Sequence, residues 1–522
     1  MLQIKPERST VLGVPLALRY NPRHFLALLL SCLNAMLEFI IKLHPEISIK
    51  SKSVRKRQTK LLERNLKTIL TQVDPDVVVT NLFDHLTVSC LNDSSAIRSK
   101  LIERLECIPG IVTFSEMRTA SFNDLHDIYL QVLAVYQTQL QGKTFCVRVR
   151  RQGKHSFSSI EAERYIGGGL NQQVSSAKVQ LKQPDITIKL EIKQDKLLLL
   201  SESFRGMGGF PLPSQSDVLS LISGGYDSAV ASYLMIRKGL RTHYLFFNLG
   251  GAAHEAGVRE MAFYLWQKYS LSHRVKFVSV DFAPVVDNIL QQVDNGVMGV
   301  ILKRMMLRAA AKVAHDLGIK AVVTGESIGQ VSSQTIANLA VIDRVIPDLV
   351  LRPLIYHDKQ DIIDIARQIG VEELAKSMPE YCGVISNKPT VNAVLTEVEQ
   401  NESKLDMALL EQVVRAAKVL DIRTIDYQAE QEAHVVSELA ELAGNAVILD
   451  IRSPEETEHS PFNDVGVPVL ELPFFRLASQ FATLDPSRHY YCYCSKGVMS
   501  RLQAVLLHEQ GHSNVSVYRP AK

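Results

Sequence analysis

Between residues 218 and 325 the sequence alternates short apolar runs with stretches of helical length and periodicity. The apolar runs are Val218 to Ile222, "HYLFFNL" at 243–249, "VKFVSVD" at 275–281 and "AVVTG" at 321–325, and the helical stretches between them end near residues 238, 270 and 317. Strands that alternate with helices form a parallel sheet, because each helix carries the chain back across the sheet to the next strand. The sequence therefore predicts a doubly wound α/β domain in the middle of the chain.

The first of these strands runs into "LISGGYDSAV" at 221–230, which combines a strand, a Gly-Gly turn and the start of a helix. Gly224 and Gly225 let the backbone approach an anion closely, while Ser223, Ser228 and the N–H groups of the first helical turn donate hydrogen bonds to it. The pattern predicts a bound phosphate. An ordinary turn between a strand and a helix is the alternative.

Two other phosphate-binding motifs are absent from the sequence. The "GKT" at 142–144 has Gln137 in the place of the first Walker glycine. The "GMGGF" at 206–210 has Pro211 in the place of the last glycine of the dinucleotide fingerprint. These departures leave "SGGYDS" as the predicted phosphate loop.

The region from residue 36 to about 200 mixes short β-type runs with amphipathic stretches at 59–72 and 95–108, an α+β pattern. The net charge of the chain is only +3, so a nucleic-acid surface depends on local clustering. "KSKSVRKRQTK" at 50–60 has six Lys or Arg and no acid, and "RVRRQGKHSF" at 148–157 has four more. A solvated helix face is the favoured explanation of one such cluster, whereas two in one region leave RNA binding and a solvated face as equal alternatives. The candidate contacts are Lys50, Lys52, Arg55, Lys56, Arg57, Arg148, Arg150 and Arg151.

The apolar stretch from Phe25 to Ile41 is the one segment with a resemblance to a signal peptide. It is interrupted by Asn34 and Glu38, and it falls short of the ~20 apolar residues that a spanning helix needs. From Met36 the chain already has the pattern of a first strand and turn, so we expect no membrane association and a 1–35 extension without a structural role. The seven cysteines do not form the dense framework of a secreted disulfide protein, which favours the cytoplasm.

The last ninety residues predict a further small α/β unit with a cysteine, Cys494, between the strand "HYYCYC" and a helix at 500–510. Helix-end N–H groups, Lys496 and Arg501 would favour its thiolate and make it a nucleophile. A buried core thiol is the alternative. A zinc site is disfavoured because Cys492 and Cys494 have C-x-C spacing and no second ligand cluster follows. The spacing to Arg501 is one residue too long for a tyrosine phosphatase.

From Met36 onward the sequence resembles the bacterial tRNA 4-thiouridine synthases, the ThiI family, in the long form with a rhodanese tail. The shared motifs are "GKTFCVRVRRQGKHSFSS", "ERYIGGGLNQ", "LISGGYDS", "FFNLGGAAHE", "GVILKRMM", "TGESIGQVSSQT", "MPEYCGVISNKPTV" and "GVMSRLQA", and "ILDIRSPEE" resembles a rhodanese opening. The main departure is the expected extension at 1–35, which matches nothing in the family. From there on, the resemblance implies a ferredoxin-like domain at 36–98, a THUMP domain at 99–203, a PP-loop ATP pyrophosphatase domain at 204–395, a helical linker at 396–440 and a rhodanese domain at 441–522.

The resemblance also implies roles for individual residues. Leu221, Ile222, Ser223, Gly224, Gly225, Ser228, Lys303, Gly325 and Gln334 would contact ATP, and Asp227 would serve the pyrophosphate and its Mg²⁺, with no tightly bound metal. Cys494 would carry a persulfide, and Cys382 would resolve it by forming a disulfide with Cys494. The implied reaction is ATP-dependent adenylation of uridine 8 in tRNA followed by sulfur transfer to give 4-thiouridine.

The implied partners are tRNA, a cysteine desulfurase as the persulfide donor, and a thiamine sulfur-carrier protein, since the family also supplies sulfur for the thiazole ring. A homodimer, in which one subunit presents tRNA to the other's active site, is compatible with the N-terminal half. Two alternatives remain at this point. One is a PP-loop synthetase that adenylates a small molecule, and the other is a non-catalytic RNA-binding adaptor whose tail shuttles sulfur.

Overall fold

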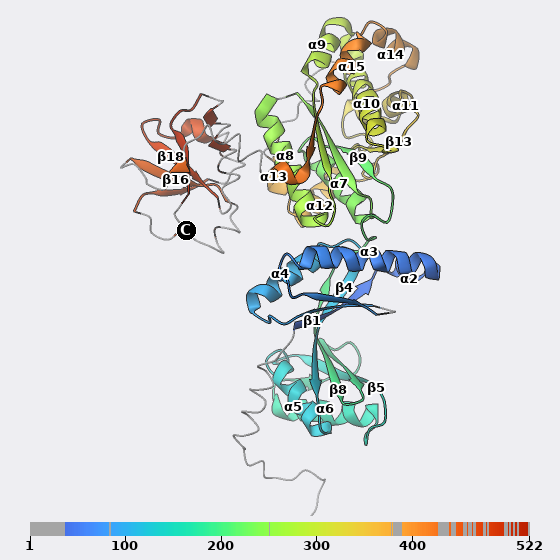
Figure 1. The fold of residues 1–522 in the computed structure, drawn as a ribbon, viewed down its shortest axis with the longest axis vertical. Helices are drawn as coiled ribbons and strands as arrows, with labels where there is room; N and C mark the ends of the chain where they lie inside the picture. Colours follow the sequence, from blue (N-terminus) through green and yellow to red (C-terminus); the bar gives the residue numbers. More distant parts are fainter. Residues whose placement is uncertain are drawn as a thin grey trace, which may run out of the picture.

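The computed structural model describes most of the chain from Leu37 onward. The described residues are 37–82, 85–249, 251–376, 378, 389–425, 438–439, 445–452, 457, 462, 466–472, 477, 480–494, 500, 503–504, 507–508 and 511–519. The expected extension at 1–35 and Cys382 lie outside these ranges. Figure 1 shows an N-terminal part below, a central domain above it and a C-terminal sheet at the left. Across the described residues, every helix is too short or too polar to span a lipid bilayer.

The N-terminal part is built on one eight-stranded sheet with the order β2-β3-β1-β4-β8-β7-β5-β6. Two long strands, β4 and β8, pair antiparallel along its middle and so join two smaller halves. Its strands are β1 (Leu37–Leu43), β2 (Val78–Asn81), β3 (Leu86–Cys90), β4 (Ile111–Ser121), β5 (Thr144–Gln152), β6 (Lys178–Val179), β7 (Ile186–Lys193) and β8 (Lys196–Arg205). Its helices are α2 (Pro45–Ser48), α3 (Lys52–Leu70), α4 (Ser95–Glu106), α5 (Leu125–Tyr136) and α6 (Ser159–Gln173).

Each half of this sheet has its own hydrophobic core. The first core extends beyond residue 98, where we expected the second domain to begin, because the amphipathic helix α4 packs against α3 and β4 and buries Leu101 and Leu105 in this core. Ser94 caps this helix by accepting a hydrogen bond from the Ile97 N–H at 3.4 Å. The second core starts with α5, where Ile128 and Val132 pack against β5 and β7.

The central domain confirms the predicted doubly wound architecture. Its sheet has the order β13-β12-β9-β10-β11-β14, and the first five of these strands run parallel. The strands are β9 (Val218–Leu221), β10 (Thr242–Asn248), β11 (Lys276–Asp281), β12 (Ala321–Val323), β13 (Leu349–Leu351) and β14 (Lys418–Asp421).

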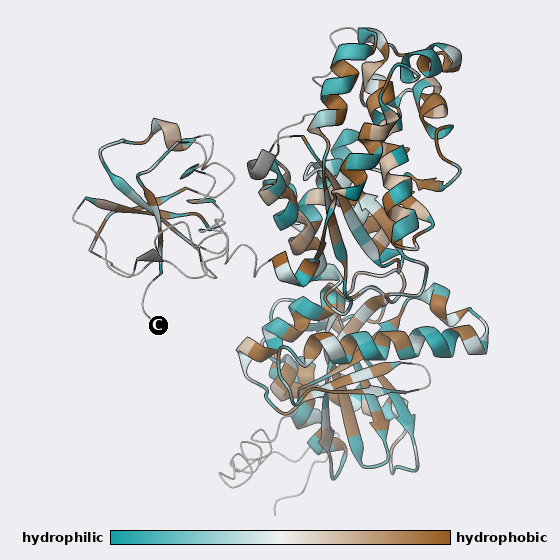
Figure 2. Cartoon of the chain, turned by 45° about the horizontal axis from the view of Figure 1, so that its top comes forward, coloured by the Kyte–Doolittle hydropathy of each residue, from teal (hydrophilic) through white to brown (hydrophobic). Residues whose placement is uncertain are grey.

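Helices cover both faces of this sheet, and each face has a separate core. Figure 2 shows that these helices carry both hydrophilic and hydrophobic residues, as amphipathic helices on a sheet should. The helices are α7 (Tyr226–Arg237), α8 (Gly251–Tyr269), α9 (Ala283–Gln292), α10 (Met298–Asp316), α11 (Ile336–Asp343), α12 (Lys359–Ile369), α13 (Glu372–Lys376), α14 (Leu395–Glu402) and α15 (Met407–Arg415), with short 3₁₀ turns η2 (Asn295–Val297), η3 (Ser332–Gln334) and η4 (Ile422–Thr424).

The expectation of a helical linker at 396–440 was wrong for its first thirty residues. Val398, Leu410 and Val413 belong to the core between the sheet and α10. The strand β14 then adds to the edge of the sheet, antiparallel to β11. Charged helices look like a connector in sequence, but the apolar stripes of α14 and α15 bury themselves against α10, so this segment is part of the central domain.

The C-terminal part is a parallel five-stranded sheet with the order β15-β19-β18-β16-β17. Its strands are β15 (Glu438–Leu439), β16 (Ala446–Asp450), β17 (Val469–Glu471), β18 (His489–Tyr493) and β19 (Val515–Tyr518), and a 3₁₀ turn η6 spans Phe481–Thr483. The predicted small α/β unit is confirmed. Of the helix expected at 500–510, residues 500, 503–504 and 507–508 are described, and these are helical.

Candidate active site

The loop between β9 and α7 has the shape that its sequence predicts. Gly224 has a φ of +84°, which favours glycine, and a Cβ added there would lie 2.8 Å from the Met378 side chain. Ser228 Oγ accepts a hydrogen bond from the Ser223 N–H at 3.2 Å and donates one to the Gly225 carbonyl at 3.0 Å. The loop therefore closes on the first turn of α7, whose N–H groups face a potential anion.

A cavity of about 780 Å³ opens beside this loop, at the carboxyl ends of the parallel strands. This edge is where open α/β sheets bind ligands, and the volume falls within the range of about 300–1,000 Å³ for small-molecule and cofactor sites. All the predicted ATP-binding residues except Gly224 line it, namely Leu221, Ile222, Ser223, Gly225, Ser228, Lys303, Gly325 and Gln334, and so does Asp227. The apolar side chains of Leu245, Phe247, Leu302 and Met306 complete one part of the wall.

Asp227 lies in the first turn of α7 and has two partners from later in the chain. Its Oδ1 is 2.9 Å from Lys359 Nζ, and its Oδ2 accepts a hydrogen bond from Gln330 Nε2 at 2.9 Å. The Lys359 ammonium also lies 5.6 Å from the centroid of the Tyr226 ring. The sequence analysis did not predict Lys359 or Gln330 as site residues. Apart from the family motifs around them, nothing in the local sequence marks either residue as functional.

Lys303 extends from α10 into the cavity, and its Nζ lies 2.6 Å from Glu326 Oε1. The other carboxylate oxygen accepts hydrogen bonds from Arg352 Nε at 2.8 Å and from Thr324 Oγ1 at 3.1 Å. Burial disfavours the charged carboxylate, but Lys303 and Arg352 outweigh it and lower the pKa of Glu326 below its ordinary value. Glu326 is therefore an ionised, nearly buried group in the wall of the site.

Gly325 and Gln334 shape the wall of the cavity. A Cβ on Gly325 would lie 2.6 Å from the carbonyl carbon of Asp227, so only glycine lets the end of β12 pack against the start of α7. Gln334 Oε1 accepts a hydrogen bond from the Ser327 N–H at 3.3 Å, which closes the loop between them. These contacts hold the two sides of the cavity together.

The helix α10 is itself fixed by a buried ion pair beneath the cavity. Arg304, 2% exposed, donates from Nε to Glu402 Oε2 at 2.7 Å and from Nη1 to the Val341 carbonyl at 2.6 Å. Arg308 donates to the other oxygen of Glu402, also at 2.7 Å. The α14 segment that looked like a linker thus anchors the helix that carries Lys303.

The two C-terminal thiols differ in their surroundings. Cys494 directly follows β18, and its Sγ accepts a hydrogen bond from the Ser500 N–H at 3.3 Å and lies 3.5 Å from Ser500 Oγ. Cys492 is fully buried in the strand, and burial raises the pKa of its thiol far above the ordinary range. The predicted Lys496 and Arg501 lie outside the described residues. Cys494 belongs to the C-terminal sheet and does not line the cavity.

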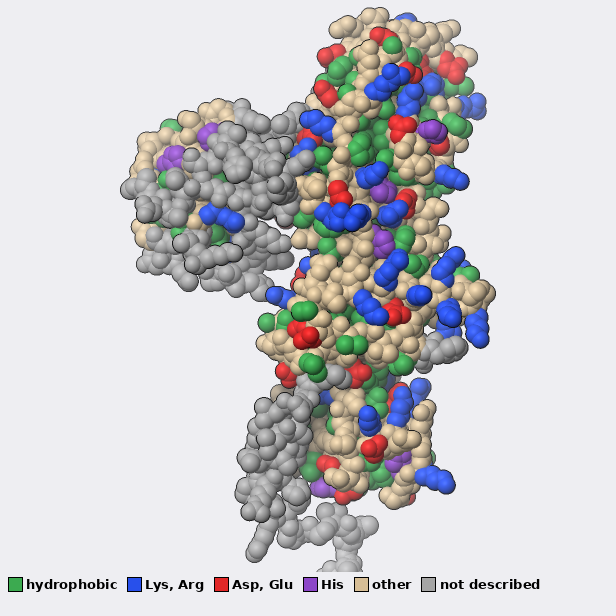
Figure 3. Space-filling view, in the orientation of Figure 1, with side chains coloured by type: hydrophobic (Ala, Val, Ile, Leu, Met, Phe, Trp, Pro, Cys, Tyr) green, Lys and Arg blue, Asp and Glu red, His purple; other side chains and the backbone are tan. Residues whose placement is uncertain are grey.

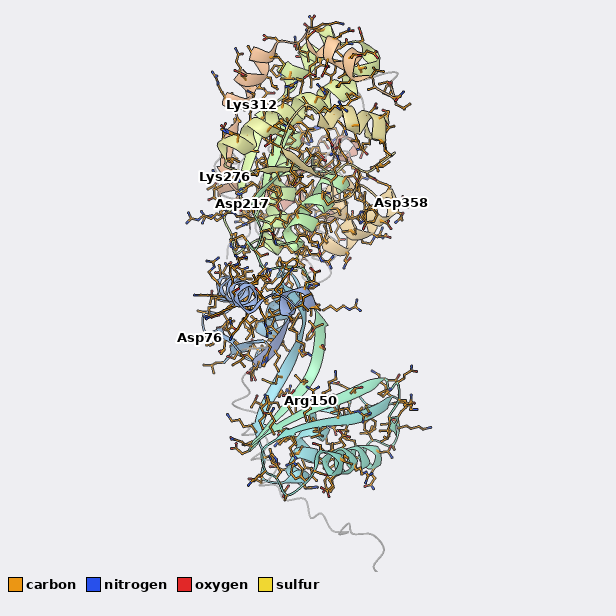
Figure 4. The ribbon with its side chains drawn as sticks, turned by 90° about the vertical axis from the view of Figure 1, so that its right-hand side faces the viewer. Asp76, Arg150, Asp217, Lys276, Lys312 and Asp358 are labelled. Atoms are coloured by element: carbon orange, nitrogen blue, oxygen red, sulfur yellow. The ribbon has the colours of Figure 1, made fainter. Side chains whose placement is uncertain are left out.

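The two basic clusters lie on different halves of the N-terminal sheet. Lys52, Lys56 and Arg57 are exposed in the first turns of α3, Lys50 is exposed just before this helix, and Arg55 is half-buried. Figure 3 shows Lys and Arg side chains gathered at this end of the helix. Arg150 projects from β5 in the lower half, where Figure 4 labels it. Its neighbours Arg148 and Arg151 are partly engaged within the protein: Arg148 donates to the Leu181 carbonyl at 3.2 Å, and Arg151 donates to the Gly153 carbonyl at 3.2 Å.

Models of known families match four successive stretches of the chain. They are the ThiI ferredoxin-like domain at 38–115, the THUMP domain at 122–202, the Thiamine biosynthesis protein (ThiI) at 213–407 and the Rhodanese-like domain at 435–520. The third of these covers the whole cavity wall from Leu221 to Pro389.

Curated relatives extend this similarity over nearly the whole chain. The tRNA sulfurtransferase of Tolumonas auensis is 59% identical over 483 residues, which are 92% of this chain and 100% of that protein. The tRNA sulfurtransferase of Colwellia psychrerythraea is 54% identical over 484 residues, which are 93% of this chain and 100% of that protein. A solved structure, a 4-thiouridine synthetase–RNA complex with bound ATP, has the same fold with a TM-score of 0.65 and 23% identity, and the match covers 74% of this chain and 99% of that one.

Proposed function

The chain belongs to the tRNA sulfurtransferase family, and on that basis we propose that it uses ATP to activate a uridine of tRNA and replaces the C4 oxygen with sulfur carried on Cys494. The observation that carries this proposal is the cavity at the carboxyl edge of the central sheet, where the phosphate loop, Asp227 and Lys303 meet. A related fold has been crystallised with RNA and bound ATP, which supports the same ligands here.

ATP would occupy the cavity with its phosphates at the N-terminus of α7. The N–H groups of that turn and the hydroxyls of Ser223 and Ser228 supply hydrogen-bond donors, and the Lys303 ammonium supplies positive charge. The apolar wall of Leu245 and Phe247 suits the adenine base. Mg²⁺ would be held by phosphate oxygens and the Asp227 carboxylate, both hard oxygen ligands, and would neutralise charge on the pyrophosphate.

The C4 oxygen of the uridine would then attack the α-phosphorus of ATP, and pyrophosphate would leave. This step converts a carbonyl oxygen, which is a poor leaving group, into AMP. Lys303 and Lys359 lie beside the phosphate loop, where they would stabilise the negative charge that develops as the bond to pyrophosphate breaks. The expected target is uridine 8.

Sulfur would reach the activated base as a persulfide on Cys494. The terminal sulfur attacks C4, AMP leaves, and the Cys382 thiolate then attacks Cys494 Sγ, which releases 4-thiouridine and leaves a Cys382–Cys494 disulfide for reduction. The Ser500 N–H donates a hydrogen bond to Cys494 Sγ and so holds the sulfur in place at the end of β18. The cavity and Cys494 belong to different sheets, so the C-terminal domain must approach the cavity in this scheme.

The basic residues of α3 and β5 are the proposed tRNA contacts, since phosphate-binding surfaces need exposed cations. A cysteine desulfurase is the proposed donor of the persulfide sulfur. The match to a family described as a thiamine biosynthesis protein supports a second use of the same persulfide, for the thiazole ring, with a sulfur-carrier protein as acceptor. A homodimer remains part of this proposal.

Two variants separate the two half-reactions. Asp227→Ala should abolish tRNA-dependent AMP release while Cys494 still accepts ³⁵S from a cysteine desulfurase. Cys494→Ser should lose ³⁵S loading and 4-thiouridine formation while tRNA binding is retained. If Asp227→Ala releases AMP at the wild-type rate, the site is misassigned. If the wild-type protein releases no AMP with tRNA and ATP, the adenylation step is wrong.

A further inference from the structure

We propose that Glu326 is a positioning residue that holds the Lys303 ammonium group in the cavity. This inference rests on the proposed ATP site. Glu326 lines the cavity with 8% of its surface exposed, and its Oε1 lies 2.6 Å from Lys303 Nζ. A lysine has a long and flexible side chain, so a fixed carboxylate at this distance selects one position for its charge.

The carboxylate can act as a fixed support because it is itself held from two sides. Arg352 Nε and Thr324 Oγ1 both donate to Oε2. Arg352 is fixed in turn by Asp343, whose oxygens lie 2.9 and 2.5 Å from the two terminal guanidinium nitrogens. Lys303, Glu326, Arg352 and Asp343 therefore form a chain of alternating charges that runs from the cavity to the surface. Rotation of Glu326 away from Lys303 would break hydrogen bonds to both other donors.

The position of Glu326 also relates Lys303 to the phosphate loop. The preceding residue, Gly325, packs directly against the backbone of Asp227. Lys303 from α10 and Asp227 from α7 are thus held on two sides of the same turn at the end of β12. A shift of the Lys303 ammonium would change its distance to any phosphate bound at the start of α7, and Coulombic attraction depends steeply on that distance in a partly buried site.

Without the Glu326 charge, the ammonium group would face the Arg352 guanidinium with no counter-ion between them. Repulsion between the two cations would move the flexible Lys303 side chain out of this position, and its attraction for a bound phosphate would weaken. Other charged or titratable groups around this part of the cavity are Asp227 on α7, His254 on α8, Asp343 on α11, Lys359 on α12 and Lys376 on α13. None of them is changed by the variants below.

A purely structural role of the charge chain is the alternative, because a buried ion pair can be nearly neutral for stability or important only for it. The test must therefore measure ATP use and not only folding. The suitable assay is tRNA-dependent AMP release by the full-length protein, with KM for ATP and kcat measured separately.

Glu326→Gln keeps the shape of the side chain and removes its charge. We expect KM for ATP to rise about tenfold, equivalent to about 1.4 kcal/mol. Glu411→Gln, which alters the half-exposed pair with Lys312, is the matched control and should leave KM unchanged.

Lys303→Met separates this inference from the proposed ATP site. If Lys303→Met leaves KM for ATP unchanged, the assignment of Lys303 to ATP is wrong. If Lys303→Met raises KM while Glu326→Gln has the wild-type KM, the ATP site stands and the positioning role of Glu326 is overturned. Should Glu326→Gln fail to fold, Glu326→Asp tests the same placement, since it sets the charge back by one methylene; an unchanged KM would also overturn the proposal.

Discussion

Lys359 at the start of α12 lies with its Nζ 2.9 Å from Oδ1 of Asp227, a residue 132 positions earlier in the sequence. The pairing places a cation beside the one carboxylate in the first turn of α7. A carboxylate alone at this point would repel a triphosphate, whereas a carboxylate paired with an ammonium group presents little net charge. In the proposed function, the pair would let Asp227 bind Mg²⁺ without weakening the attraction of the helix N-terminus for phosphate.

Lys359→Met should lower the rate of tRNA-dependent AMP release by about 10²-fold, the loss typical of removing one donor that acts on developing charge. The protein should still fold normally, because the Lys359 side chain is 42% exposed and its ion pair contributes little to stability. Single-turnover AMP release measures the rate, and circular dichroism checks the folding. Lys312→Met, which removes an exposed lysine outside the cavity, is the control. A Lys359→Met rate within twofold of the wild type would contradict the assignment.

Gly325→Ala should weaken ATP binding and destabilise the central domain by about 1–3 kcal/mol, the usual cost of overpacking. The added methyl group would lie 2.6 Å from the carbonyl carbon of Asp227, and neither backbone can move without opening the cavity wall. Gly168→Ala is the control, because a Cβ at this exposed helical position in α6 meets nothing within 4 Å. That change should stabilise the protein by about 0.5–1 kcal/mol. Urea unfolding and ATP titration without tRNA measure both effects.

The sequence predicted the central domain well because its signals are local. The alternation of β9, α7 and β10 appears in the sequence as a change in the spacing of its hydrophobic residues. The Gly-Gly turn between Ser223 and Tyr226 is recognisable because glycine lets the backbone approach an anion closely. This local pattern predicts that Ser223 and Ser228 contact one bound phosphate, whereas Asp227 enters the predicted site through the family resemblance. The residues at 303, 325 and 334 came from family motifs, and only the fold explains why they meet: they lie at the carboxyl edge of one sheet or on a helix beside it.

The missed features depend on contacts between distant parts of the chain. Lys359 and Glu326 look like ordinary charged residues in sequence, and their roles follow only from their partners at 227, 303 and 352. The segment from α14 to β14 was read as a linker because it is rich in charge. Its apolar residues alternate with charged ones, and Glu402 is buried only because two arginines of α10 neutralise it.

Glu402→Gln should destabilise the central domain by about 3–5 kcal/mol, because it leaves the buried Arg304 guanidinium without a counter-ion. The side chains of Arg304 and Glu402 are only 3% and 8% exposed. Glu411→Gln on α15 is the control: its ion pair with Lys312 is half-exposed and should change stability by no more than about 1 kcal/mol. The urea unfolding midpoints of the two variants can be compared by tryptophan fluorescence, since Trp266 lies in the same domain. Equal midpoints for the two variants would show that α14 does not anchor α10.

Cys492→Ala should leave sulfur loading intact, in contrast to Cys494→Ser. Burial raises the pKa of the Cys492 thiol, so it stays protonated and unreactive around neutral pH. Its loss should cost about 1–2 kcal/mol of stability in the C-terminal core, through the small cavity it leaves. Intact-protein mass spectrometry after incubation with a cysteine desulfurase and cysteine counts the added sulfur. If the Cys494→Ser variant forms a persulfide and the Cys492→Ala variant does not, Cys492 is the sulfur carrier and Cys494 is not.

Replacing both Lys56 and Arg57 with glutamine should weaken tRNA binding and flatten its dependence on salt. Each phosphate contact that is lost removes one released counter-ion, so the slope of log K against log salt concentration should fall by about 0.7–0.9 per contact. Both side chains are exposed near the start of α3. Lys67→Gln, on the same helix but already paired with Glu63 at 2.8 Å, is the control and should leave the slope unchanged. Filter binding at several salt concentrations measures it, and an unchanged slope in the double variant would place the tRNA surface elsewhere.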